Sequence, residues 1–194
     1  AIGLAAQKSI ANIFGALTIL LNRPFEIGDY VAIGAHTGTV KDIWLTYITL
    51  KDMQGHDVMI PNEVIITSSI ENQSRREYRR ADMSLGLVYE TSLEDMKHAV
   101  SLVERYLEAM KQSGKLQYYR VHFDMFGDFS LNILITYFSW TTDYTDFIKE
   151  KEMINLEIKK LFEENNLEMA FPTSEMIIKN EGSEKSLAKT SVKK

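Results

Sequence analysis

The pattern of apolar and polar positions divides the chain into parts with different periods. Residues 1–22 are mostly apolar and carry one charged residue, Lys8. A helix of that length would be about 33 Å long, near the hydrocarbon thickness of a bilayer. Residues 23–82 alternate with the period of two that strands show, and residues 83–180 mix helical and strand periods. Residues 181–194 are rich in Lys and Ser and have little to bury, so we expect a disordered tail.

Between residues 23 and 82 the sequence predicts four or five short strands joined by tight turns. The candidate strands are 29–33, 39–44, 46–50, 57–60 and one short strand drawn from 64–67 and 69–72, with turns at 34–38 and 52–56. Short strands with tight turns are typical of a small barrel of the SH3 or Sm type. We therefore expect a β-barrel domain over 23–82.

Residues 83–180 predict a ferredoxin-like α/β domain, because their elements follow the order β-α-β-β-α-β. The candidate strands are 83–88, 119–125, 130–140 and 167–171, and the candidate helices are 93–113 and 144–165. Ser92 is a candidate cap for the first of these helices, with two acidic residues in its first turn. The expected fold class is α+β.

The composition argues against an enzyme. The chain has 194 residues, no cysteine and a formal net charge of −5. The missing cysteines exclude a disulfide scaffold, thiolate zinc sites and cysteine catalysis. No phosphate-binding glycine loop or nucleophile motif is present, and the four histidines do not show the spacing of metal ligands. We expect no catalytic residue, no cofactor and no metal ion.

Two segments leave alternatives open. Residues 75–80 place four arginines around Tyr78 and suit either phosphate or RNA binding or a linker whose arginines pair with nearby acids. The acidic balance of the chain favours the linker. Residues 1–22 suit either a buried amphipathic helix or the cytoplasmic end of a pore helix, since small residues allow close helix packing. The chain starts with Ala1 inside this apolar segment, so we expect it to be part of a longer protein.

An ordered series of motifs resembles the small-conductance mechanosensitive channel (MscS) family. The motifs lie at 3–7, 12, 23–31, 38–40, 58–62, 70–74 and 171–172. The resemblance implies a homo-oligomer, usually a heptamer, in an inner or plasma membrane, with residues from about 23 onward in the cytoplasm. Its partners would be membrane lipid and permeating ions, with no nucleic acid. Membrane tension would open the channel and release ions and small solutes on hypo-osmotic shock. The alternatives are a soluble Sm-like ring that binds RNA or a ligand, and a non-conducting channel homologue.

The resemblance also implies roles for individual residues. The matching positions are Leu4 for the pore gate; Gln7, Lys8, Asn12 and Gly15 for the kink and lining of the pore helix; Arg23, Pro24, Phe25, Gly28 and Asp29 for the junction between helix and barrel; and Met176, Ile177 and Ile178 for a strand of a small C-terminal barrel. Many family members have glycine at the position of Lys8. Lysine lacks the flexibility of glycine, so the kink moves towards Asn12 or Gly15, or the helix bends less.

Overall fold

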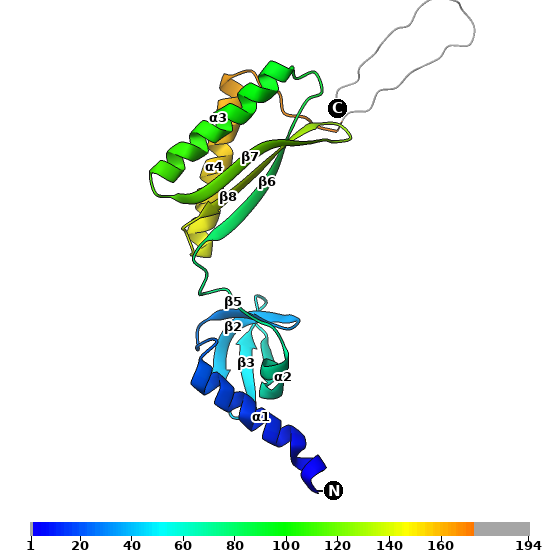
Figure 1. The fold of residues 1–194 in the computed structure, drawn as a ribbon, viewed down its shortest axis with the longest axis vertical. Coiled ribbons are helices and arrows are strands. Elements are labelled where there is room, and N and C mark those ends of the chain that lie inside the picture. The colour runs from blue at the N-terminus through cyan, green and yellow to red at the C-terminus, as the bar shows by residue number, and fades with distance from the viewer. Residues whose placement is uncertain (1, 173–194) are drawn as a thin grey trace, which may run out of the picture. The chain divides into compact units, whose positions relative to one another are not determined.

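The computed structural model describes residues 2–172, with side chains from residue 6 onward (Figure 1). The chain divides into two compact units, with the boundary between Glu77 and Tyr78. This boundary lies five residues before the expected one, because residues 79–82 already belong to the first strand of the second unit. The tail expected at 181–194 and the strand expected at Met176, Ile177 and Ile178 lie outside the described residues.

The first unit combines a long helix with a five-stranded antiparallel sheet. Its elements are α1 (Ile2–Asn22), β1 (Tyr30–Ile33), β2 (His36–Ile43), β3 (Tyr47–Lys51), β4 (Asp57–Pro61), α2 (Asn62–Thr67) and β5 (Ile70–Asn72). The strand order is β4-β3-β2-β1-β5, so the last strand returns to pair with the first. The structure therefore has five short strands here, within the expected four or five.

Two local predictions in this unit are wrong. The expected turn over 34–38 is a two-residue hairpin loop, with Ile33 paired to His36, so that Gly38 lies inside β2. Gly34 has φ of 56°, which suits a tight hairpin turn. Residues 64–67, considered as part of a strand, belong to helix α2, which buries Asn62 and Ile65 on one side, three residues apart.

The core of the first unit consists of one residue from α1, one from the following loop, one from α2 and six from the strands. These residues are Ile19, Phe25, Val31, Ile33, Val40, Ile48, Leu50, Ile60 and Ile65. In β1 the buried residues alternate with half-buried ones, as the period of two predicts. The helix and the sheet thus share one core through Ile19.

The second unit packs two helices against a three-stranded sheet. Its elements are β6 (Arg79–Leu87), α3 (Leu93–Gln112), β7 (Leu116–Phe126), β8 (Leu131–Ser139) and α4 (Tyr144–Glu164), with strand order β6-β8-β7. Ser92 caps α3, as predicted, by accepting a hydrogen bond from the Asp95 N–H at 3.0 Å. Buried residues of both helices pack against alternate residues of β8, including Ile133 and Ile135.

The fourth strand expected at 167–171 is reduced to an isolated bridge between Leu87 and Met169. The Ala170 N–H also donates to the Gly86 carbonyl at 2.9 Å, so this segment still lies along the free edge of β6. The order of elements is that of the ferredoxin-like prediction, and the α+β fold class is confirmed.

Candidate functional site

Helix α1 touches the rest of its unit through one narrow face. Gly15 and Ile19, one turn apart, are buried on that face. A Cβ atom added at Gly15 would lie 2.3 Å from the carbonyl oxygen of Asn62, which begins α2. Only glycine lets the two helices approach this closely. The structure therefore gives Gly15 a packing contact, and its part in a kink stays a prediction.

Asn12 adds a polar contact one turn before Gly15. Its Oδ1 accepts a hydrogen bond from the Glu63 N–H at 2.9 Å, and its Nδ2 donates to the Lys8 carbonyl at 3.0 Å. The neighbouring Asn62 is fully buried and donates from Nδ2 to the Trp44 carbonyl at 2.9 Å. A continuous set of contacts thus runs from α1 through the start of α2 to the turn between β2 and β3.

Gln7 and Lys8 lie nearer the N-terminus of α1, where a groove of about 500 Å³ separates α1 from α2. The groove is lined by Gln7, Lys8, Ala11, Glu63, Val64, Ile66 and Thr67. Lys8 and Glu63 bring opposite charges to its two sides. The helix continues unbroken from Ile2 to Asn22 through both positions. Leu4 lies in α1, but the structure describes side chains only from residue 6.

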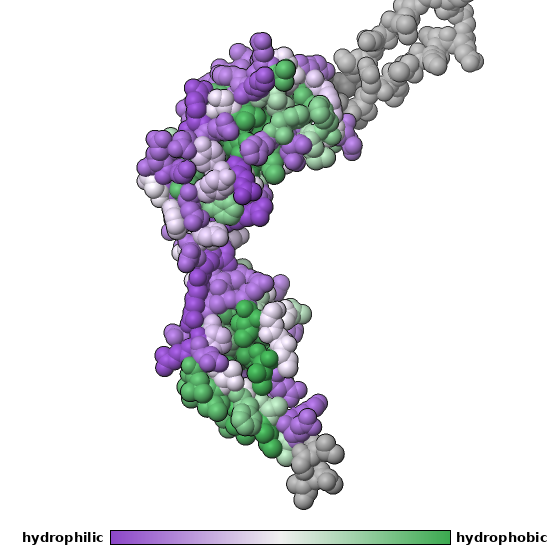
Figure 2. Space-filling view, in the orientation of Figure 1, coloured by the Kyte–Doolittle hydropathy of each residue, from purple (hydrophilic) through white to green (hydrophobic). Residues whose placement is uncertain are grey.

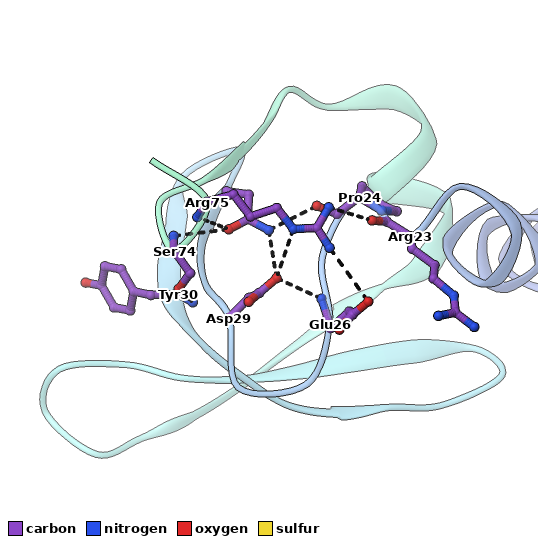
Figure 3. Close-up of polar contacts among 8 residues, drawn as sticks. Arg23, Pro24, Glu26, Asp29, Tyr30, Ser74 and Arg75 are labelled. Carbon is purple, nitrogen blue, oxygen red and sulfur yellow. Dashed lines mark hydrogen bonds and ion pairs between the residues drawn. The ribbon is translucent and has the colours of Figure 1, made fainter. Parts of the chain in front are cut away.

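The predicted junction residues come together where α1 ends (Figure 3). The N–H of Arg23 makes the last helical hydrogen bond, to the Ile19 carbonyl at 2.9 Å. The φ of Arg23 is 44°, and this left-handed conformation ends the helix. Arg75, from the segment after β5, donates from Nη1 to the Arg23 carbonyl at 3.0 Å. The same guanidinium lies 3.8 Å from a carboxylate oxygen of Glu26 and 3.8 Å from one of Asp29.

Asp29 is the centre of this group. Its Oδ2 accepts hydrogen bonds from the Glu26 N–H at 2.9 Å and from Asn72 Nδ2 at 2.7 Å. Asn72 Nδ2 also donates to the Pro24 carbonyl at 3.1 Å. We call Arg23, Pro24, Glu26, Asp29, Asn72 and Arg75 the junction network. It ties the end of α1 to the start of β1 and to the end of β5.

Phe25 and Gly28 complete the junction beside this network. Phe25 is 1% exposed and belongs to the core of the unit. Gly28 has φ of 97°, a conformation that favours glycine, and its N–H donates to the Val40 carbonyl at 2.8 Å. All five predicted junction residues therefore lie in one connected region, although their part in gating stays a prediction.

The electrostatics of the junction centre on the Asp29 carboxyl. Partial burial raises the pKa of Asp29, but the hydrogen bonds from Asn72 and the Glu26 N–H, together with the Arg75 charge, outweigh it. The pKa of Asp29 therefore lies below its ordinary value. The folded state holds this side chain as a carboxylate.

We expect Asp29→Asn to destabilise the first unit by about 1–2 kcal/mol near neutral pH, because it removes the charge from these hydrogen bonds. The pKa of Asp29 is lower in the folded state, so its contribution is full above the ordinary Asp pKa of about 3.9 and is lost as the pH falls through the folded value. Urea unfolding of both proteins between pH 7 and pH 3 checks this. The gap should close towards acid. A gap that stays constant over this range would contradict the role of the charge. Asp124→Asn, on the exposed β7–β8 hairpin, is the control.

The arginines of residues 75–80 have partners within their own units; residues 75–78 link β5 to β6, and Arg79 and Arg80 begin β6. Arg75 belongs to the junction network, and Arg76 donates from Nε to the Gln73 carbonyl at 2.7 Å. Arg79 donates from Nε to the Thr142 carbonyl at 2.7 Å, and Arg80 pairs with Asp82 at 2.9 Å. The linker interpretation therefore fits the structure better than the RNA-binding one.

The opposite side of α1 is an exposed apolar strip (Figure 2). Its large side chains are 46–72% exposed; they are Ile10, Ile13, Phe14, Leu17, Leu20 and Leu21. A contiguous exposed apolar strip of this kind is typical of a surface that contacts another molecule or a membrane. None of the helices in the described part of the chain has the length and apolar character of a membrane span.

Three residues that build the site were not predicted as part of it. Asn62, Asn72 and Arg75 each connect segments far apart in the chain. Asn62 and Asn72 belong to the motifs at 58–62 and 70–74, so the motif series contained a signal for them. Arg75 stood in the arginine segment, where the favoured linker interpretation expected arginines paired with acids; its pairing with Glu26 and Asp29 fits this, but those partners were not named.

Comparisons with known proteins give a consistent result. Residues 8–75 match the family description "Mechanosensitive ion channel, beta-domain", and residues 81–169 match "Mechanosensitive ion channel MscS, C-terminal". The chain is 35% identical over 173 residues to the small-conductance mechanosensitive channel MscMJ of Methanocaldococcus jannaschii, covering 89% of this chain and 49% of that protein. It is 27% identical over 185 residues to the low conductance mechanosensitive channel YnaI of Escherichia coli, covering 93% of this chain and 53% of that protein. The chain thus spans about half the length of these relatives.

Solved structures show the same fold. The Arabidopsis thaliana MSL1 A320V structure has a TM-score of 0.80 at 18% identity, covering 88% of this chain and 64% of that chain. Helicobacter pylori MscS in its closed state has a TM-score of 0.75 at 22% identity, covering 93% of this chain and 70% of that chain.

Proposed function

Because the chain belongs to the MscS family of mechanosensitive ion channels, we propose that it is the end of the pore helix and the cytoplasmic part of a tension-gated channel subunit. Open channels would release ions and small solutes on hypo-osmotic shock. The observation that supports this most is the two-sided character of α1. One side is tied to the β domain through Asn12, Gly15 and Ile19, and the other is an exposed apolar strip.

The geometry suggests how tension would reach the pore. The apolar strip of α1 faces lipid in this proposal, so the free energy of the helix depends on the state of the membrane. Tension favours the state that occupies more area. The contact of Gly15 with Asn62 and the junction network hold α1 to the β domain, so the two move together.

We further propose how the subunits assemble. The subunits form a homo-oligomer, a heptamer in the form the family suggests, in the inner or plasma membrane, with residues from about 23 onward in the cytoplasm. Leu4 side chains form a hydrophobic constriction that gates by dewetting. Gln7 and Lys8 lie near the conduction path, and Met176, Ile177 and Ile178 supply one strand per subunit to a C-terminal barrel. Lipid and ions are the partners, and no catalytic step is involved.

Survival after osmotic downshock tests the proposed release of solutes. We expect the full-length protein to raise the survival of bacteria that lack their own tension-gated channels, because an open pore relieves turgor before lysis. Counting colonies after a shift from high to low osmolarity gives the result. Cells that carry the protein in the membrane but survive no better than cells with the empty vector would contradict it.

A further inference from the structure

Lys8 belongs to the face of α1 that contacts the rest of the first unit. The residues of this face recur at intervals of four, three and four positions, as residues on one side of a helix do: Lys8, Asn12, Gly15 and Ile19. The last three of them contact α2 or the core, whereas the exposed apolar strip lies on the other side. Lys8 therefore faces α2, which lies beside α1 in Figure 1.

Glu63 lies across the groove from Lys8. Both residues line the space of about 500 Å³ between α1 and α2, where Lys8 is exposed and Glu63 is half-buried. In the part of the chain that the structure describes, neither side chain makes an ion pair or a hydrogen bond. Partial burial of a carboxylate costs free energy unless a cation or a hydrogen-bond donor compensates for it. The ammonium of Lys8 is a cation on the facing side of the same groove.

One asparagine side chain joins the backbones of these two residues. Asn12 donates from Nδ2 to the Lys8 carbonyl at 3.0 Å and accepts at Oδ1 from the Glu63 N–H at 2.9 Å. The two polar atoms of an amide group are about 2.3 Å apart, so the Lys8 carbonyl oxygen lies within about 8 Å of the Glu63 nitrogen. A lysine ammonium sits on a flexible four-carbon stem. Rotation of the two side chains is therefore sufficient to bring the charges together.

We propose that Lys8 and Glu63 form an ion pair across the groove at low ionic strength and separate at high ionic strength. The screening length is about 10 Å at 0.1 M salt and about 3 Å at 1 M salt, so an exposed pair weakens as salt is added. When the pair forms, it adds a second tie between α1 and α2 beside the hydrogen bond from Glu63 to Asn12.

The consequence for gating rests on the proposed function, in which α1 is the end of the pore helix and α2 is cytoplasmic. Water that enters the cell stretches the membrane and also dilutes the cytoplasmic salt. Dilution strengthens the pair, so the β domain holds the pore helix more firmly as the tension rises. The coupling of α1 to the β domain then depends on the ionic strength of the cytoplasm.

A double-mutant cycle on this chain tests the pair. Lys8→Gln, Glu63→Gln and the double variant are unfolded with urea in a Trp140→Phe background, so that Trp44 reports on the first unit. Urea is uncharged and leaves the ionic strength free to vary. At about 0.05 M salt, we expect the increase in the unfolding constant of the double variant to be about two- to fivefold smaller than the product of the two single increases. At about 1 M salt this coupling should fall below about 1.5-fold.

Two further variants separate the pair from other effects of the substitutions. In a Lys8→Arg background the cation is kept, so Glu63→Gln should cost about as much as in the unsubstituted chain. Glu71→Gln is the matched control, because Glu71 is exposed on β5 and does not line the groove. We expect it not to couple to Lys8→Gln. Glu63 also interacts with the dipole of α2, and the cycle cancels this effect.

Coupling below about 1.5-fold at low salt would overturn the proposal and is the result expected if the ammonium points into the conduction path instead. Coupling that stays the same at low and high salt would overturn it as well. Neither readout depends on conduction. Salt-dependent coupling in a protein that never responds to tension would support the ion pair while contradicting the proposed activity.

Discussion

Replacing Phe25 with alanine should destabilise the first unit by about 3–5 kcal/mol, a larger effect than we expect from any other substitution at the junction. Phe25 is 1% exposed and packs in the core that α1 and the sheet share. It also follows the left-handed turn at Arg23 and lies in the sequence between Pro24 and Glu26 of the junction network. Alanine would leave a cavity at the point where the helix meets the barrel.

Urea unfolding measured by tryptophan fluorescence tests this prediction. Trp44 is in the first unit and Trp140 follows β8 in the second, so a Trp140→Phe background makes Trp44 report on the first unit alone. Leu21→Ala is the control, because Leu21 is 72% exposed and its loss should change stability by about 0.5 kcal/mol or less. A Phe25→Ala protein within 1 kcal/mol of its parent, an amount well under the estimate for a buried aromatic residue, would show that Phe25 does not anchor the junction.

Gly15→Ala should destabilise the first unit by about 1–3 kcal/mol, although the same change stabilises most helices. Alanine is favoured over glycine within a helix by about 1 kcal/mol. At this position, however, the new Cβ would lie 2.3 Å from the Asn62 carbonyl oxygen and 2.8 Å from its Cβ. The helices must separate to admit it, which also strains the hydrogen bond from Glu63 to Asn12.

Ser9→Ala is the matched control for this prediction. Ser9 is exposed on α1, so there alanine should act through helix propensity alone and stabilise slightly. Both variants are compared by urea unfolding in the Trp140→Phe background. If Gly15→Ala stabilises the unit as much as Ser9→Ala does, the close approach of α1 to α2 is not what holds the helix in place.

Local patterns were sufficient to predict the elements with strong periodicity. Helix α3 begins at the predicted Ser92 cap. A serine side chain can accept a hydrogen bond from a free N–H of the first turn, and acidic residues in that turn interact favourably with the helix dipole. Helix α2 was missed because its six residues include Val64, Ile65 and Ile66, which local propensity assigns to a strand. Burial of Asn62 and Ile65 favours a helix over a strand here, and that burial depends on the rest of the fold.

The site residues likewise divide into those that the sequence predicted and those that it did not. The motif at 23–31 placed Arg23, Pro24, Phe25, Gly28 and Asp29 together, because they are neighbours in the sequence. Their partners could not be predicted, since Asn72 lies 48 residues from Pro24 and Arg75 lies 52 residues from Arg23. Gly15 drew attention as a flexible point of a helix. Its contact with Asn62 becomes visible only when the fold brings α2 against α1.

We infer that membrane tension opens the channel to which this chain belongs. Patch-clamp recording of the full-length protein, in cells without their own tension-gated channels and with stepwise suction, tests it most directly. We predict openings whose probability rises reproducibly with tension and returns when suction is released. Silence up to lytic tension, with the protein confirmed in the same membrane, would contradict tension gating.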